Sequence, residues 1–212
     1  MLPVPYYENE LGRLYHGDCL TILPDLEPVD LVLTDPPYGI GADKKNAHSS
    51  IRDNPKWSES EWDRQRPTKE VFDEMLRVAK KVAIWGGNYF TDYLPVSSGW
   101  FVWVKPTADT GFSMADGELC WTSEKFSLRV IKNNKNYSGQ HPTQKPVALM
   151  QWCLLKLSQE KNTVLDPFLG SGTTAVACER LKRRWIGIEI SEEYCAIAVK
   201  RIEAERKQLK LF

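Results

Sequence analysis

The apolar positions of this chain form short continuous runs, separated by stretches in which apolar residues recur every three or four positions. The runs predict buried strands, because a strand covered on both faces shows no alternation of apolar and polar residues. The helical spacing between the runs predicts helices. The expected strands are 13–16, 31–34, 82–85, 100–104, 118–122, 164–165 and 185–190, and the expected helices are 21–26, 67–81, 146–157, 173–180 and one that Ser191 caps.

This succession of strands and helices predicts an α/β fold with a mostly parallel sheet. The chain has 212 residues, of which 42% are hydrophobic, and can bury one such core without room for a second full domain. We therefore expect a single domain over 1–212. Five cysteines without CxxC spacing predict reduced, packed thiols. The three histidines are spread along the chain, so no metal site is expected.

Two expected strands end in unusual runs, TDPPYG at 34–39 and DPFLGSGTT at 166–174. Open α/β sheets bind ligands at the carboxyl ends of parallel strands, so both runs are candidate site segments. In the first run two prolines impose a rigid turn that presents a carboxylate, a carbonyl and an aromatic ring. These groups accept protons and stack on rings, but none is a nucleophile. An ordinary turn that packs its tyrosine is the alternative interpretation.

The second run has the composition of a nucleotide-binding loop without a phosphate-binding lysine. Gly170 and Gly172 let the backbone approach a ligand closely, and Thr173 and Thr174 open the following helix. Glu189 ends a strand about 20 residues further on, where a carboxylate can bind the ribose hydroxyls of a nucleotide. A helix-start acid is the alternative for Glu189.

Together these runs resemble the motifs of the DNA amino-methyltransferases, which use S-adenosylmethionine to methylate an exocyclic amine of adenine or cytosine. Residues 35–38 match the catalytic signature, 166–172 match the cofactor loop, and the run QHPTQKP at 140–146 precedes that loop. This order resembles the β subgroup, with its circularly permuted motifs. The resemblance covers 12–201. It implies a class I methyltransferase fold, a Rossmann-like seven-stranded mostly parallel sheet with helices on both faces.

The resemblance also implies a catalytic role for each residue from 35 to 38. Asp35 and the carbonyl of Pro36 would accept the two protons of the target amine, and Pro37 completes the rigid turn before Tyr38, which would stack on a flipped base. Asp in this motif is more often tied to adenine N6, and Ser to cytosine N4. Adenine is therefore the expected target. Cytosine N4, an RNA or protein amine, and an inactive cofactor-binding protein are the alternatives.

The cofactor residues implied by the resemblance come from several parts of the chain. Asp18 would contact the adenine amine, or it is only a helix cap. Lys145 would pair with the methionine carboxylate, or it is a surface lysine. The full expected set is Asp18, Cys19, Thr143, Lys145, Asp166, Pro167, Phe168, Gly170, Ser171, Gly172, Thr173, Thr174 and Glu189. The segments 85–89 and 103–106 follow expected strands and are weaker candidates for lining the base pocket.

The expected macromolecular partner is double-stranded DNA. Lys plus Arg and Asp plus Glu number 28 each, so binding must come from local asymmetry rather than from net charge. The polar segment 40–66 is expected to be a DNA-contacting loop, since it holds Lys44, Lys45, Arg52, Lys56, Arg64 and Arg66. The segment 123–140 leaves room only for a minimal target-recognition insert. We therefore expect a short target or relaxed specificity.

A second subunit is the other source of base contacts, so the sequence leaves a homodimer open. No apolar run approaches membrane-spanning length, and the first nine residues lack the pattern of a signal peptide. The expectation is a cytoplasmic protein, encoded by a bacterium or a phage, that has no contact with a membrane.

Overall fold

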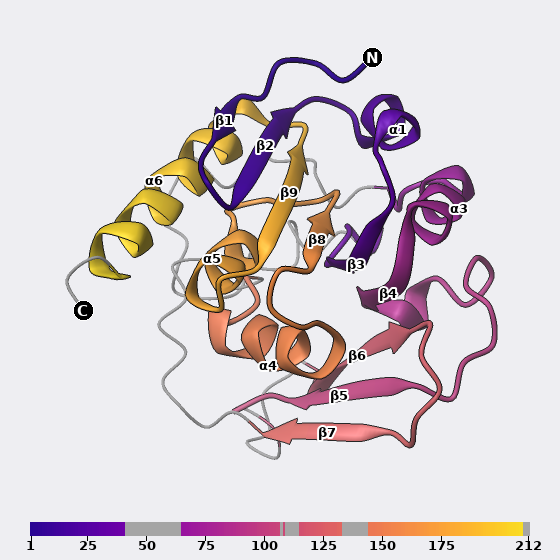
Figure 1. Cartoon of the computed structure of the whole chain (residues 1–212). Helices are drawn as coiled ribbons and strands as arrows, with labels where there is room; N and C mark the ends of the chain where they lie inside the picture. The colour runs from indigo at the N-terminus through magenta and orange to yellow at the C-terminus, as the bar shows by residue number, and fades with distance from the viewer. Residues whose placement is uncertain (41–64, 107, 109–114, 133–143, 210–212) are drawn as a thin grey trace, which may run out of the picture.

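The computed structural model describes residues 1–40, 65–106, 108, 115–132 and 144–209 (Figure 1). Its elements, with η for 3-10 helices, are in chain order β1 (Tyr7–Glu8), β2 (Gly12–His16), α1 (Cys19–Ile22), η1 (Leu23–Asp25), β3 (Val29–Thr34), α3 (Lys69–Val78), β4 (Ala79–Trp85), η4 (Gly87–Tyr89), β5 (Trp100–Val104), β6 (Gly117–Thr122), β7 (Arg129–Lys132), α4 (Val147–Leu157), β8 (Thr163–Asp166), α5 (Thr173–Arg180), β9 (Arg184–Glu189) and α6 (Glu192–Leu209). None of these helices is both long and apolar enough to cross a membrane.

The strands form one sheet in the order β1-β2-β9-β8-β3-β4-β6-β5-β7. Its centre, from β2 through β9, β8 and β3 to β4, is parallel throughout. Next to β4 the direction reverses, because β6 pairs antiparallel with both β4 and β5. β7 then runs parallel to β5 at that edge, and β1 pairs antiparallel with β2 at the other. An antiparallel hairpin therefore extends a parallel core.

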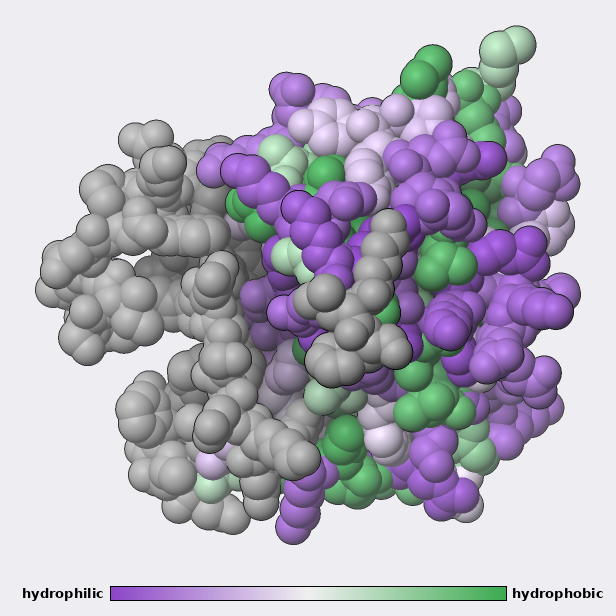
Figure 2. Space-filling view, turned by 60° about the vertical axis from the view of Figure 1, so that its left-hand side comes forward, coloured by the Kyte–Doolittle hydropathy of each residue, from purple (hydrophilic) through white to green (hydrophobic). Residues whose placement is uncertain are grey.

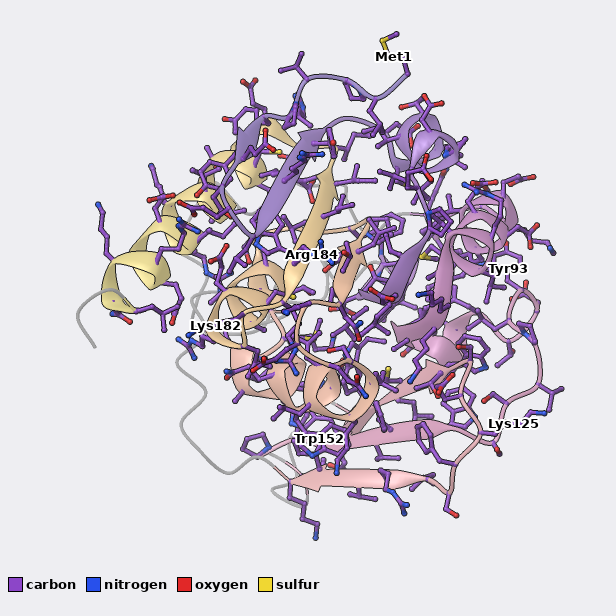
Figure 3. The ribbon with its side chains drawn as sticks, in the orientation of Figure 1. Met1, Tyr93, Lys125, Trp152, Lys182 and Arg184 are labelled. Atoms are coloured by element: carbon purple, nitrogen blue, oxygen red, sulfur yellow. The ribbon has the colours of Figure 1, made fainter. Side chains whose placement is uncertain are left out.

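Helices cover both faces of this sheet, as Figure 1 shows. On one face α4, α5 and α6 pack over strand residues such as Leu31 and Leu33, and on the other α1, η1 and α3 pack over Val32. The alternation along β3 follows from the two-residue period of a strand. In Figure 3 Trp152 of α4 reaches toward β5, where its ring meets that of Phe101 edge-on at a centroid distance of 4.7 Å.

The expected fold class is confirmed: a mostly parallel sheet with helices on both faces, in which all seven expected strands are present. The expected strand count is wrong, because the described part of the chain forms nine strands. The two additional strands are β1, with two residues, and β7, whose residues are mostly exposed. Neither produces the buried apolar run on which the prediction of strands depended.

Two helix boundaries also differ from the expectation. The first helix begins at Cys19 rather than at 21, because the side chain of Asp18 accepts a hydrogen bond from Leu20 N at 2.9 Å and caps it there. The second helix ends at Val78, and the next residues already belong to β4.

On the face shown in Figure 2, apolar residues form scattered patches among hydrophilic ones in the described part of the surface.

The close packing of β2 against β9 gives a prediction about stability. A Cβ on Gly12 would lie 2.2 Å from the ring of Trp185, whose indole is buried and held by a hydrogen bond from Nε1 to Glu179 Oε1 at 2.8 Å. Gly12→Ala should therefore lower the free energy of unfolding by about 1–3 kcal/mol, measured by urea denaturation. In a Trp185→Leu background the same change should cost clearly less. An equal cost in both backgrounds would contradict this account.

Candidate active site

The two unusual runs meet at the carboxyl edge of the sheet, where β3 and β8 are neighbours. Thr34 Oγ1, at the end of β3, donates a hydrogen bond to Asp166 Oδ1 at 2.7 Å. The same carboxylate accepts Phe168 N at 3.1 Å and Thr174 Oγ1 at 2.6 Å. Asp166 therefore ties three parts together: the end of β3, the turn after β8 and the first residues of α5. The Asp166 carboxylate therefore anchors the 166–174 loop to the end of β3.

Asp35 and Tyr38 form a compact pair in the turn that follows β3. The hydroxyl of Tyr38 donates to Asp35 Oδ1 at 2.5 Å. The Tyr38 ring lies nearly parallel to that of Tyr89, with centroids 4.9 Å apart. On the backbone of Gly86, which has a φ of +69°, a Cβ would lie 2.1 Å from the Tyr38 ring. A glycine is thus required there both by the left-handed backbone and by the close approach of the tyrosine.

Lys145 reaches the same carboxylate from the segment before α4. Its ammonium lies 2.7 Å from Asp35 Oδ2, 3.2 Å from the Tyr38 hydroxyl and 2.7 Å from Glu118 Oε2. The residue is only 6% exposed, so the alternative of a surface lysine is wrong. Glu118 on β6 is paired in turn with Lys105, with 2.7 Å between Oε1 and Nζ. The site therefore contains two carboxylates and two ammonium groups in one cluster.

Burial and charge act in opposite directions on this cluster. Burial raises the pKa of Asp35, and the charge of Lys145 offsets only part of that rise. Burial alone would also raise the pKa of Glu118, but Lys145 and Lys105 together bring it down to about 2. For Lys145, burial favours the neutral amine, yet the charges of Asp35, Tyr38 and Glu118 raise its pKa well above the usual value. We conclude that Lys145 and Glu118 are charged at neutral pH.

A cavity of about 100 Å³ lies at the carboxyl ends of β2, β8 and β9. It is lined by Gly17, Asp18, Cys19, Pro167, Phe168, Glu189 and Ile190. Five of these residues belong to the expected cofactor set. Glu189 accepts Gly170 N on one oxygen at 2.7 Å and Ser191 N on the other at 2.8 Å, and each oxygen keeps a second lone pair. Glu189 can therefore hold the start of the last helix and bind a ligand at the same time. Asp18 likewise caps α1 and lines the cavity.

Other residues of the expected cofactor set do not line this cavity. Ser171 and Thr173 face α6 and the segment before α4, where they contact Arg201 and the side-chain amide of Gln144. The hydroxyl of Thr174 is bound to Asp166, and Gly172 has a φ of +86° and approaches Ala198. Thr143 lies outside the described residues, as do 41–64 of the expected DNA-contacting loop and 133–140 of the expected recognition insert.

Glu118 was missed in the sequence because a single acidic residue at the start of an apolar strand resembles an exposed edge position. Lys105 lies in the segment 103–106, which the sequence offered only as a weak candidate for lining the base pocket. Tyr89, from the similar segment 85–89, does contact the 35–38 turn by stacking on Tyr38. Among the described residues no group of three or more His, Cys, Asp or Glu side chains is arranged to hold a metal ion.

Comparison with known proteins finds a matching family model and relatives in sequence. The N6/N4 family model, described as DNA methylase, matches residues 102–200. The type II methyltransferase M2.LlaDCHI of Lactococcus lactis subsp. cremoris is 26% identical over 95% of this chain and 93% of its own. M2.DpnII of Streptococcus pneumoniae, also a type II methyltransferase, is 26% identical over 98% and 95% of the two chains.

Solved structures agree with the sequence relatives. The crystal structure of the M1.HpyAVI–SAM complex is 25% identical, covers 91% of this chain and 99% of its own, and superposes with a TM-score of 0.63. These findings show the resemblance to the N6/N4 DNA amino-methyltransferases that the motifs implied. The cytosine-N4-specific PvuII DNA methyltransferase, at 20% identity and a TM-score of 0.63 over 93% of this chain and 88% of its own, shows the fold alone.

The anchor residue Asp166 gives a prediction about the pH dependence of stability. Burial raises the pKa of Asp166 from 3.8 to about 6, although Thr174, Thr34 and Phe168 N stabilise its charged form. Between these values the folded protein binds a proton that the unfolded chain has lost. The free energy of unfolding should therefore fall by about 3 kcal/mol as the pH rises from about 4 to 6, and level off above.

The measurement is urea denaturation across this pH range for the wild type and for Asp166→Asn, in which the dependence due to this group should disappear. The matched control is Asp73→Asn on the exposed surface of α3. It should keep the dependence of the wild type. The same pH slope in Asp166→Asn as in the wild type would contradict the assignment.

Proposed function

We propose that this protein transfers a methyl group from S-adenosylmethionine to the exocyclic N6 amine of adenine in double-stranded DNA. The observation that carries the proposal is the junction of the Asp35 turn and the 166–174 loop through the bond from Thr34 to Asp166. It puts an acceptor for an amine and a nucleotide-binding loop at adjacent strand ends. The match of residues 102–200 to the N6/N4 DNA methylase model supports the same reaction class.

The chemistry of the cavity at the ends of β2, β8 and β9 fits the adenosyl part of such a cofactor. Phe168 and Pro167 give it an apolar and aromatic wall, and Asp18 and Glu189 bring acceptors to it. In this proposal Glu189 binds the ribose hydroxyls, and Asp18 and Cys19 lie beside the adenine. The related M1.HpyAVI forms a complex with the same cofactor. When bound, S-adenosylmethionine supplies an electrophilic methyl group on a sulfonium.

The remaining residues of the cofactor set would act near the methionine end. Gly170, Ser171, Gly172 and Thr173 belong to the turn and first helical turn that follow β8, and Thr174 holds that turn to Asp166. The family resemblance places Lys145 and Thr143 at the methionine carboxylate. Because the ammonium of Lys145 contacts Asp35, we propose that this lysine joins the cofactor end of the site to the catalytic turn.

The catalytic step in this proposal depends on positioning rather than on a covalent intermediate. Asp35 accepts a hydrogen bond from one N–H of the target amine and the carbonyl of Pro36 accepts one from the other, so the nitrogen lone pair is turned toward the methyl group. The amine loses one proton to solvent when the methyl group is transferred. Each oxygen of Asp35 has one bound partner and a second lone pair with which to accept. Pro36 and Pro37 keep the turn rigid, and Tyr38 stacks on the flipped base.

Adenine is preferred over cytosine because an aspartate occupies the first position of the DPPY run. Cytosine N4 is the second candidate, and an RNA or protein amine is a third. We further propose that 40–66 contacts DNA and that 123–140 contributes a minimal recognition insert. A second subunit in a homodimer is the alternative source of base contacts. A type II restriction–modification role in a bacterial cytoplasm fits the names of the relatives.

The direct test is the transfer of labelled methyl from S-adenosylmethionine to unmethylated genomic DNA, followed by mass spectrometry of the digested nucleosides. N6-methyladenine supports the proposal, and N4-methylcytosine replaces it by the second candidate. If DNA takes up no label although the cofactor binds, the DNA assignment is wrong and RNA and protein substrates become the candidates.

Removal of the catalytic carboxylate gives a mutational prediction. Asp35→Ala should reduce methyl transfer by at least about 100-fold, because the target amine loses the acceptor that orients it. The dissociation constant for S-adenosylmethionine, measured by calorimetry, should change by only a few fold. The control Asp73→Ala removes a carboxylate from the exposed surface of α3 and should leave both quantities unchanged. Transfer at the wild-type rate by Asp35→Ala would refute the mechanism.

A further inference from the structure

The antiparallel end of the sheet supplies two charged side chains beside the site: Glu118, which contacts Lys145, and Lys105, which pairs with Glu118. Glu118 faces Trp103 across the pairing of β5 and β6, and Lys105 follows two residues after Trp103. Diagonal positions of an antiparallel pair are within reach of long side chains. The resulting pair of Glu118 and Lys105 is largely buried, with side chains 21% and 16% exposed.

We propose that Glu118 is a positioning residue, which together with Lys105 holds Lys145 between two carboxylates and so keeps Asp35 available to accept the target amine. This role in catalysis rests on the proposed methyl transfer. It concerns a residue outside both motifs, and it rests on the contacts of four described side chains.

The contacts of Lys145 show how Asp35 and Glu118 share its positive charge. An ammonium group has three N–H donors, and three oxygens lie around this one: Asp35 Oδ2, the Tyr38 hydroxyl and Glu118 Oε2. Glu118 Oε2 lies at ion-pair distance without the alignment of a hydrogen bond. Lys145 is therefore drawn toward Glu118 by charge while it donates to Asp35. Without Glu118 its whole charge would be directed at Asp35 and Tyr38.

The charge balance explains why Lys105 belongs to the same cluster of buried charges. When Asp35 is ionised, Asp35 and Glu118 supply two negative charges, and Lys145 and Lys105 supply two positive ones. Buried charges are tolerated when they are paired, and removing one partner leaves an uncompensated charge. Lys105 stabilises the anionic form of Glu118, as its contribution to the low pKa of that carboxyl shows. Glu118 is therefore anionic at neutral pH and attracts Lys145 there.

Among the described residues, several titratable groups surround Asp35. Tyr38 comes from its own turn, Lys145 from the segment before α4, Glu118 and the Cys120 thiol from β6, and Asp166 from β8. Of these, Lys145 lowers the pKa of Asp35 and Glu118 raises it. Changes at Glu118 and at Lys145 should therefore move the pKa of Asp35 in opposite directions. A pair that served only to stabilise the fold would not give this result.

The test is a pH titration of Asp35 in the full chain without cofactor or DNA, followed by NMR of ¹³C-labelled aspartate carboxyls. Asp35→Asn identifies the signal by its disappearance. Glu118→Gln, which keeps the shape of the side chain, should lower the pKa of Asp35 by about one unit. Lys145→Met should raise it by at least as much. The control Glu124→Gln changes a carboxylate just after β6 that is paired with Lys81, and it should leave the titration unchanged.

Kinetics provide the second measurement. In Glu118→Gln, kcat for methyl transfer should fall about 10-fold, because Lys145 then pairs with Asp35 alone and competes with the target amine. KM for S-adenosylmethionine should stay within about two-fold, and the acid limb of the pH profile should move down with the pKa of Asp35. Glu118→Asp, which is one methylene shorter, should recover part of the loss.

Lys105→Met serves if Glu118→Gln does not fold: with Glu118 uncompensated, the pKa of Asp35 should rise. Overlapping titration curves for Asp35 in the wild type and in folded Glu118→Gln would overturn the inference, as would an unchanged pKa in Lys105→Met. These titrations do not depend on methyl transfer, because they are carried out without cofactor or DNA. A wild-type protein that methylates no DNA would refute the proposed function, while the titration would still decide whether Glu118 acts on Asp35.

Discussion

The hydrogen bond from Thr34 to Asp166 is the contact on which the arrangement of this site depends. It joins the ends of β3 and β8, which are 132 residues apart in the sequence and adjacent in the sheet. Through its other oxygen and through Phe168 N, the Asp166 carboxylate also fixes the turn and the start of α5. A buried carboxylate must be satisfied by donors, so its position allows little variation in the loops around it.

The 35–38 turn adds a second set of buried charges beside this anchor. Asp35 and Lys145 sit where burial works against their charged forms, and Glu118 and Lys105 complete a neutral cluster. Such a cluster is a weak source of stability, because removing charges from water costs nearly as much as their attraction returns. Its value lies in fixing positions. The parallel part of the sheet supplies the two motifs, and the antiparallel hairpin supplies the counter-charges that surround one of them.

Much of the fold could be predicted from local patterns. Each of the seven expected strands carries a short apolar stretch, and each appears in the sheet. β7 was missed because its residues are mostly exposed, and β1 because two residues form no pattern. For the candidate site, the sequence named Asp35, Tyr38 and the 166–174 loop through motif spacing, and it treated Lys145 as a cofactor or surface residue. Its contact with Asp35 depends on how the segment before α4 packs against β3 and β6, which no local pattern records.

The sequence by itself determined which segments become strands and which residues stand at their carboxyl ends, because periodicity, prolines and glycines act within a few residues. Only the tertiary structure decided which of these ends are neighbours. The order β8-β3-β4-β6-β5 places Asp166 beside Thr34 and brings Glu118 and Lys105 to Lys145. The physical reason is that strand order follows from the packing of whole faces against helices, whereas a charged residue within a strand looks the same in sequence whether it meets water or a buried partner.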